Sequence, residues 1–130
     1  MTRRMRMAPA LAVTALALAW SAACGTSAVR TTTYQVPGGN ADRGKQLIAS
    51  YGCGSCHTIP GVKRATALVG PPLIHFGRRG YIAGELPNGA DNLERWIQNP
   101  KGVEPGTAMP DLGVTPQDAK DIAAYLLGLQ

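Results

Sequence analysis

The run Cys53-Gly54-Ser55-Cys56-His57 constrains the fold more than any other part of this 130-residue chain. It places two thiols and an imidazole within five consecutive residues. Large apolar side chains are scarce, because Phe, Tyr and Trp together number 7 whereas Gly and Pro together number 26. A small domain of this composition does not easily stabilise itself by side-chain burial alone. Three cysteines are too few for a disulfide scaffold, so we expect a metal or a cofactor to complete the core.

Four kinds of site could use this motif. A thioredoxin-like dithiol needs a βαβ context, and the sequence has no alternating strand of useful length. A zinc site would need four ligands, which could come from Cys53, Cys56, His57 and His75, but the adjacent Cys56 and His57 would be an awkward tetrahedral pair. A disulfide between the two cysteines would leave the core incomplete. The interpretation we favour is one covalent haem c, in which Cys53 and Cys56 each add to a vinyl group and His57 ligates the iron.

Three helices are predicted from apolar periodicity and capping residues, over 41–51, 91–99 and 116–127. Asn40 is a favourable N-cap for the first, and Thr115 is one for the third. The second is expected to begin at Asp91, with Glu94 three residues later, as in a capping box. The stretch 81–84 could add a short helical turn.

Two long connections, over 58–79 and 100–114, are rich in Gly and Pro. Loops of this length are uncommon in an ordinary packed domain, but they make sense if they wrap a cofactor. The predicted class is therefore all-α, with three main helices plus long loops wrapped around one covalent haem.

The first 23 residues are predicted to be a secretory signal peptide. An apolar stretch over 8–19 is followed by small residues over 21–23 and preceded by the basic residues Arg3, Arg4 and Arg6. No charge lies between Arg6 and Arg30, so an uncleaved membrane anchor is the alternative.

Cys24 follows the signal directly. The run Ser21-Ala22-Ala23-Cys24 resembles the lipobox of bacterial lipoproteins, in which the cysteine is lipidated and becomes the mature N-terminus. We therefore expect lipidation at Cys24, the alternative being a stray cysteine beside an ordinary signal. Residues 24–40 lack periodicity and are rich in Thr, Gly and Ser, which predicts a flexible tether. The domain itself is expected over 41–130.

Four stretches between residues 41 and 129 resemble the small class I cytochromes c. They are Gly70-Pro71-Pro72-Leu73, Trp96-Ile97-Gln98-Asn99-Pro100, Pro105-Gly106-Thr107-Ala108-Met109-Pro110 and Ala124-Tyr125-Leu126. Within the family, the stretch 86–110 is most similar to the cytochrome domain fused to subunit II of some haem-copper oxidases. The resemblance also implies that the first helix crosses the last one closely, with Gly44 against Tyr125.

The resemblance implies the iron ligands. His57 is the proximal ligand and Met109 the distal one, and the rival for the distal position is His75, the other histidine of the chain. The carbonyl of Pro71 accepts the N–H of the proximal histidine. Ligation by His and Met raises the reduction potential and fills both axial positions, so no open site remains for substrate chemistry.

Further residues are assigned near the haem by the same resemblance. Trp96 is expected to pack against the haem and the methionine. Thr107 and Arg78 correspond to positions near the haem propionates. Arg79 is an equal candidate for the position that is assigned to Arg78.

These observations predict an electron carrier rather than an enzyme, and the resemblance makes a haem-copper oxidase the leading acceptor. The alternatives are an electron-accepting haem subunit of a periplasmic dehydrogenase and a haem-based redox or gas sensor with a labile Met109. From Cys24 onward the chain has 10 basic and 8 acidic residues, a net charge of only +2, so no nucleic-acid partner is expected. We expect a monomer outside any complex, anchored at the periplasmic side of the bacterial cytoplasmic membrane.

Overall fold

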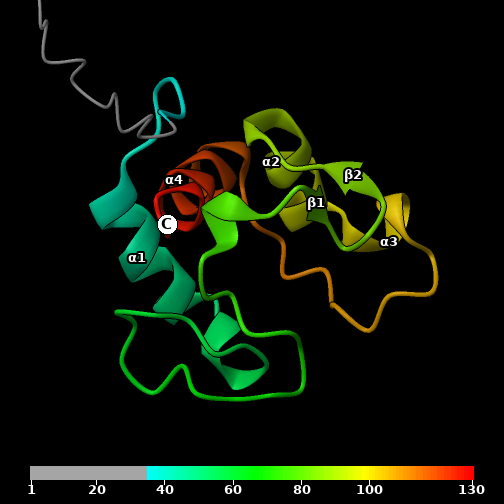
Figure 1. The fold of residues 1–130 in the computed structure, drawn as a ribbon, viewed down its shortest axis with the longest axis horizontal. Coiled ribbons are helices and arrows are strands. Elements are labelled where there is room, and N and C mark those ends of the chain that lie inside the picture. The colour runs from blue at the N-terminus through cyan, green and yellow to red at the C-terminus, as the bar shows by residue number, and fades with distance from the viewer. Residues whose placement is uncertain (1–34) are drawn as a thin grey trace, which may run out of the picture. The chain divides into compact units, whose positions relative to one another are not determined.

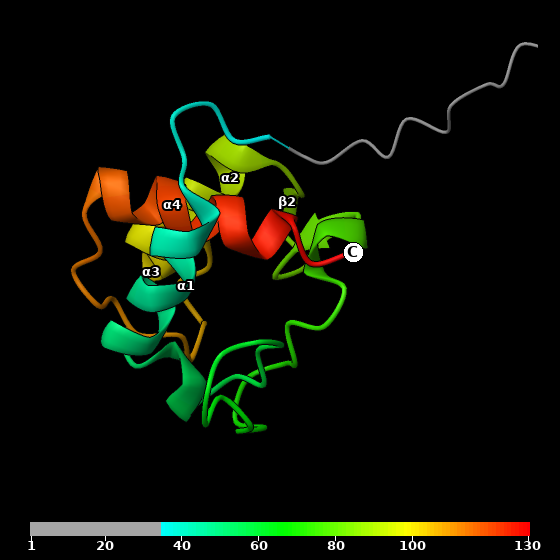
Figure 2. The same ribbon diagram turned by 90° about the vertical axis from the view of Figure 1, so that its left-hand side faces the viewer.

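The computed structural model describes residues 35–130 as a set of short helices joined by long loops (Figure 1). The helices are α1 (Ala41–Ser50), α2 (Ala90–Gln98), α3 (Pro100–Val103) and α4 (Pro116–Leu127), with 3-10 turns at Cys53–Ser55 and Phe76–Arg78 and two strands, β1 (Tyr81–Ile82) and β2 (Leu86–Pro87). Helix α4 packs against both α1 and α2. Figures 1 and 2 place the loop of residues 52–75 at the end of the molecule away from α2. The predicted all-α class is confirmed.

Capping side chains begin two of the helices as predicted. The Asn40 side chain accepts the backbone N–H of Arg43 at 3.0 Å, and the Thr115 hydroxyl accepts that of Asp118 at 3.2 Å. The capping box at α2 was wrong, because the helix begins at Ala90 and its N-cap is Gly89, which has no side chain to cap it. Asp91 lies inside the first turn, where its charge favours the helix dipole.

The expected helical turn over 81–84 was also wrong. Residues Tyr81 and Ile82 pair antiparallel with Pro87 and Leu86. Ala83 and Gly84 have φ angles of 54° and 83°, and such a pair of left-handed residues matches the right-handed twist of a tight β-hairpin. The hairpin was missed because its first turn residue is an alanine, which rarely adopts positive φ.

A glycine allows α1 and α4 to cross closely. A Cβ atom on Gly44 would lie 2.5 Å from the carbonyl carbon of Asp121 and 2.9 Å from the backbone nitrogen of Ile122. The predicted close crossing is confirmed, and the atoms nearest to Gly44 belong to the backbone of Asp121 and Ile122. Tyr125, the predicted partner of Gly44, donates its hydroxyl hydrogen to the carbonyl of Pro60 at 2.6 Å and so binds the loop that follows the motif.

The packed chain extends N-terminal to residue 41. Val36 is only 7% exposed and belongs to the hydrophobic core, and Gln117 on α4 donates to the carbonyl of Gly38 at 3.1 Å. The predicted signal peptide, Cys24 and the tether up to residue 34 lie outside the described residues. Among the helices within residues 35–130, none has the length and apolar character needed to cross a membrane.

Candidate functional site

The Cys53–His57 motif forms a tight turn directly after α1. Gly52 has φ 74°, a left-handed conformation that turns the chain out of the helix, and the backbone N–H of His57 donates to the carbonyl of Cys53 at 3.0 Å. Both cysteines are half-buried and free of a disulfide. Burial raises the pKa of the Cys53 thiol. The local fold therefore presents two thiols and one imidazole on a single turn.

An apolar cavity lies beside this turn. Its lining combines Cys53 and His57 from the turn, Trp96 from α2 and Met109 from the loop that precedes α4. The other lining side chains, from α1, α2, α4 and the loops, are all aliphatic or aromatic. The space between these side chains is about 550 Å³ when the part that is open to solvent is counted. Cys56 is half-buried but does not line this space.

The His57 ring is held by the loop of residues 70 and 71. Its Nδ1 lies 2.8 Å from the carbonyl oxygen of Pro71, the contact that the family resemblance implies. A carbonyl can only accept, so Nδ1 carries the hydrogen and Nε2 keeps a free lone pair for a metal. A Cβ atom on Gly70 would lie 2.8 Å from Nδ1 of this ring, and its N–H donates to the Cys56 carbonyl at 2.7 Å. Sequence reasoning missed this role for Gly70.

The loop that carries Met109 is organised by Thr107. The Thr107 hydroxyl accepts the backbone N–H of Met109 at 3.2 Å, and the Thr107 N–H donates to the carbonyl of Glu104 at 3.0 Å. Thr107 does not itself line the cavity. In the structure it therefore shapes the backbone that presents the thioether.

The structure does not bring His75 or Arg78 to the cavity. Nδ1 of His75 lies 2.6 Å from the carbonyl oxygen of Gln130, and the Arg78 side chain is exposed. The guanidinium of Arg79 donates to the carbonyl of Pro72 and lies 5.3 Å from the centre of the Phe76 ring. Within residues 35–130, no three His, Cys, Asp or Glu side chains converge as a metal-binding group, so the four-ligand zinc set is not assembled.

These residues fit a haem. The turn supplies thiols for covalent attachment and an imidazole nitrogen for the iron, and the second loop supplies a soft, polarisable thioether. The apolar lining suits a macrocycle that would replace the large side chains missing from the core.

Comparison with known proteins agrees with this geometry. A family model described as cytochrome c matches residues 41–130. The chain is 35% identical over 91 residues to a cytochrome c oxidase subunit 2 of Alkalihalophilus pseudofirmus, which covers 69% of this chain and 26% of that protein. It is 37% identical over 102 residues to a cytochrome c homolog of Bradyrhizobium diazoefficiens, with 65% and 53% covered.

Another relative is matched over almost its whole length. The chain is 31% identical over 107 residues to a cytochrome c of Euglena viridis, covering 71% of this chain and 99% of that protein. By contrast, the chain spans only about a quarter of the oxidase subunit of Alkalihalophilus pseudofirmus. The shared part is therefore a domain of the size of a complete small cytochrome.

Proposed function

Since this chain belongs to the cytochrome c family, we propose that it carries single electrons on a haem whose iron is ligated by His57 and Met109. Haem c is bound covalently in this family, and Cys53 and Cys56 are positioned to hold it. When bound, the haem iron supplies the one-electron couple. The observation that carries the proposal is that His57 and Met109, from distant parts of the chain, line one apolar cavity.

The residues around the cavity support this role. The Pro71 carbonyl fixes the tautomer of His57 and directs Nε2 to the iron. The Met109 thioether favours the reduced state relative to a second nitrogen ligand. His57 and Met109 would both hold the iron within this apolar lining, so no ligand position on the iron would be left for a substrate. The chain therefore transfers electrons without binding a substrate at the metal.

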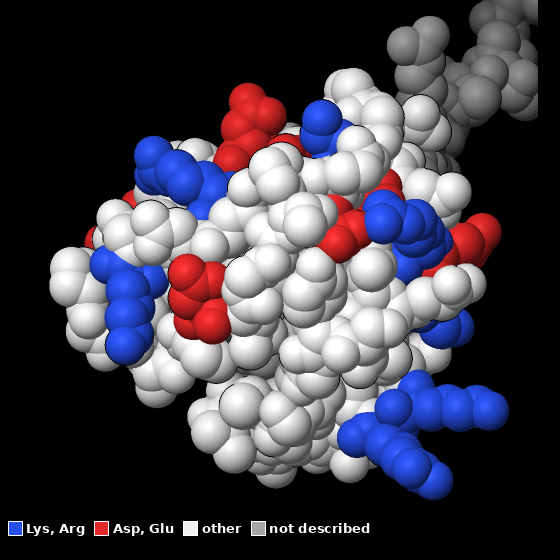
Figure 3. Space-filling view, turned by 180° about the vertical axis from the view of Figure 1, so that it is seen from behind, with Lys and Arg blue, Asp and Glu red and all other residues white. Residues whose placement is uncertain are grey.

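We propose a haem-copper oxidase as the electron acceptor. The support is the similarity to three proteins named cytochrome c oxidase subunit 2. A contact surface for it lies on the loop that holds His57, where Leu68 and Val69 are 76% and 81% exposed. On the face drawn in Figure 3, basic and acidic side chains are scattered around a broad uncharged area. Because these two aliphatic side chains are largely exposed, we propose that apolar contact at Leu68 and Val69 dominates docking.

Replacing both Leu68 and Val69 by Ser should weaken docking without altering the haem. Loss of two buried aliphatic side chains from an interface should raise KM for oxidation of the reduced protein by a purified haem-copper oxidase about tenfold or more, with kcat unchanged. Oxygen consumption measures both constants. Tyr81→Ser removes another exposed large side chain, on β1, and should leave KM unchanged. An unchanged KM in the double variant would place docking elsewhere, and no turnover with the wild type would exclude the oxidase as acceptor.

We further propose that residues 1–23 are a cleaved signal, that Cys24 is lipidated, and that the domain lies at the periplasmic side of the bacterial cytoplasmic membrane. The support is the sequence pattern, and Val36, the first buried residue among those that the structure describes, lies 12 positions after Cys24. About 11 residues separate Cys24 from Val36, which gives a root-mean-square reach of about 20 Å if they are flexible.

Cys24→Ser should release the protein from membranes. In a bacterial host with cytochrome maturation, the wild type should sediment with the membrane fraction, and the variant should be soluble because it lacks the acyl anchor. Intact-mass measurement should show an acylated terminus in the wild type alone. If the variant stays in the membrane fraction, the N-terminal segment is an uncleaved anchor instead.

A further inference from the structure

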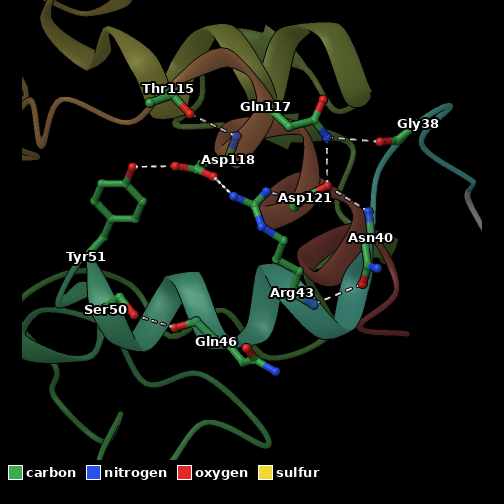
Figure 4. Close-up of polar contacts among 10 residues, drawn as sticks. All are labelled: Gly38, Asn40, Arg43, Gln46, Ser50, Tyr51, Thr115, Gln117, Asp118 and Asp121. Atoms are coloured by element: carbon green, nitrogen blue, oxygen red, sulfur yellow. Dashed lines mark hydrogen bonds and ion pairs between the residues drawn. The ribbon is translucent and has the colours of Figure 1, made fainter.

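A polar network lies at the crossing of α1 and α4 (Figure 4), and none of its residues lines the cavity. Arg43 on α1 donates to both Asp118 and Asp121 on α4. Both aspartates are buried: Asp118 is 8% exposed and Asp121 is 1% exposed. Asp121 also accepts the backbone N–H of Asn40 at 2.8 Å and the Gln117 amide at 3.1 Å. The guanidinium of Arg43 therefore links α1 to two buried carboxylates of α4.

One end of this network reaches the haem-binding turn. The Tyr51 hydroxyl donates to Asp118 at 2.7 Å, and Tyr51 lies two residues before Cys53. The backbone N–H of Asp118 donates in turn to the hydroxyl of Thr115, the N-cap of α4 and the residue at which the Met109 loop ends. Asp118 thus connects the start of the motif to the end of the loop that carries the thioether.

The Met109 loop has few other polar attachments. Within the described residues, the hydrogen bonds made by residues 105–113 have their partners inside the loop, at Glu104, Thr107 and Asp111. Beyond apolar packing, the position of the loop depends on where its two ends are fixed, at α3 and at α4. The second of these ends is the one that Tyr51 reaches.

The contacts within the network favour the charged forms of both carboxylates. The hydrogen bond from Tyr51 is the largest influence that keeps the pKa of Asp118 below its usual range, and Arg43 acts in the same direction. Burial acts to raise the pKa of Asp121, but its contacts with Asn40, Arg43 and Gln117 outweigh burial and lower it. Apolar side chains could often stabilise such a crossing equally well, so a buried ionic network favours a role in fixing geometry.

We propose that Tyr51 is a positioning residue for Met109, because its hydrogen bond to Asp118 fixes the beginning of α4, and with it the end of the Met109 loop, relative to the turn that carries Cys53 and His57. The inference rests on the proposed ligation by Met109. Without the bond, the loop end shifts relative to this turn, and the thioether leaves the iron more often.

The test is the rate at which cyanide binds to the oxidised holoprotein, since cyanide can bind only while Met109 is dissociated. Tyr51→Phe keeps the ring that packs on the core and removes only the hydroxyl. Loss of one hydrogen bond to a charged acceptor should raise the rate about tenfold, equivalent to about 1.4 kcal/mol. An unchanged rate would overturn the proposal.

Two control variants separate positioning from general loosening. Gln117→Ala removes the hydrogen bonds to Gly38 and Asp121 at the other end of the network, so it should lower the free energy of unfolding but leave the cyanide rate unchanged. Tyr81→Phe alters an exposed tyrosine and should change neither quantity. If Gln117→Ala accelerates cyanide binding as much as Tyr51→Phe does, the proposal is wrong. Rapid cyanide binding to the wild type would instead contradict ligation by Met109 itself.

Discussion

Replacing Met109 by Ala should leave the haem attached and open the distal iron position to carbon monoxide. Attachment depends on Cys53 and Cys56, which the substitution does not touch, whereas Met109 supplies the one thioether among the residues that line the cavity with His57. Carbon monoxide should bind the reduced variant readily and the reduced wild type hardly at all. The reduction potential should fall by on the order of 0.1 V, a part of the range of about 0.8 V that axial ligands span. Spectra under carbon monoxide and a redox titration measure both effects.

The matched control for this prediction is His75→Ala. In the wild type, the imidazole of His75 contacts the carbonyl of Gln130 and does not line the cavity. The variant should therefore behave as the wild type in both measurements. If His75→Ala opened the iron to carbon monoxide and Met109→Ala did not, the distal ligand would be His75.

Gly44→Ala should destabilise the holoprotein strongly. The added methyl group would meet the backbone of Asp121 and Ile122, which cannot move without separating α1 from α4. The gain in helix propensity is about 1 kcal/mol, and overpacking against backbone outweighs it. The expected net loss is about 3 kcal/mol in the free energy of unfolding, measured by denaturant titration of the haem-bound protein.

Gly80→Ala provides the comparison for this loss. A Cβ atom on Gly80 meets no other atom within 4 Å, and its backbone is not left-handed. The variant should therefore match or slightly exceed the stability of the wild type. A Gly44→Ala protein as stable as Gly80→Ala would show that the helices do not cross as closely as described.

Local signals in the sequence were sufficient for much of the helical structure. Asn40 and Thr115 cap their helices as predicted because an N-cap needs only a side-chain oxygen and an N–H three residues later. The hairpin at 81–87 could not be read in this way, since the left-handed conformation of Ala83 contradicts its local preference. Tertiary contacts decide such positions.

The candidate site likewise has parts that could be predicted from the sequence and parts that could not. The motif turn and the His57–Pro71 contact follow from residues close in sequence or from the family resemblance. The network of Arg43 with Asp118 and Asp121 was missed because its partners are more than 70 positions apart. Its one signal is the placement of two acidic residues, three apart, on the buried face of a helix, where a carboxylate needs a partner.

X-ray absorption at the iron edge tests most directly whether His57 and Met109 are the axial ligands. For the oxidised wild-type holoprotein, our account predicts one sulfur atom in the first coordination shell, from Met109, together with nitrogens from the haem and from His57. The sulfur signal should disappear in Met109→Ala and remain in His75→Ala. A first shell made of nitrogen alone in the wild type would contradict the account.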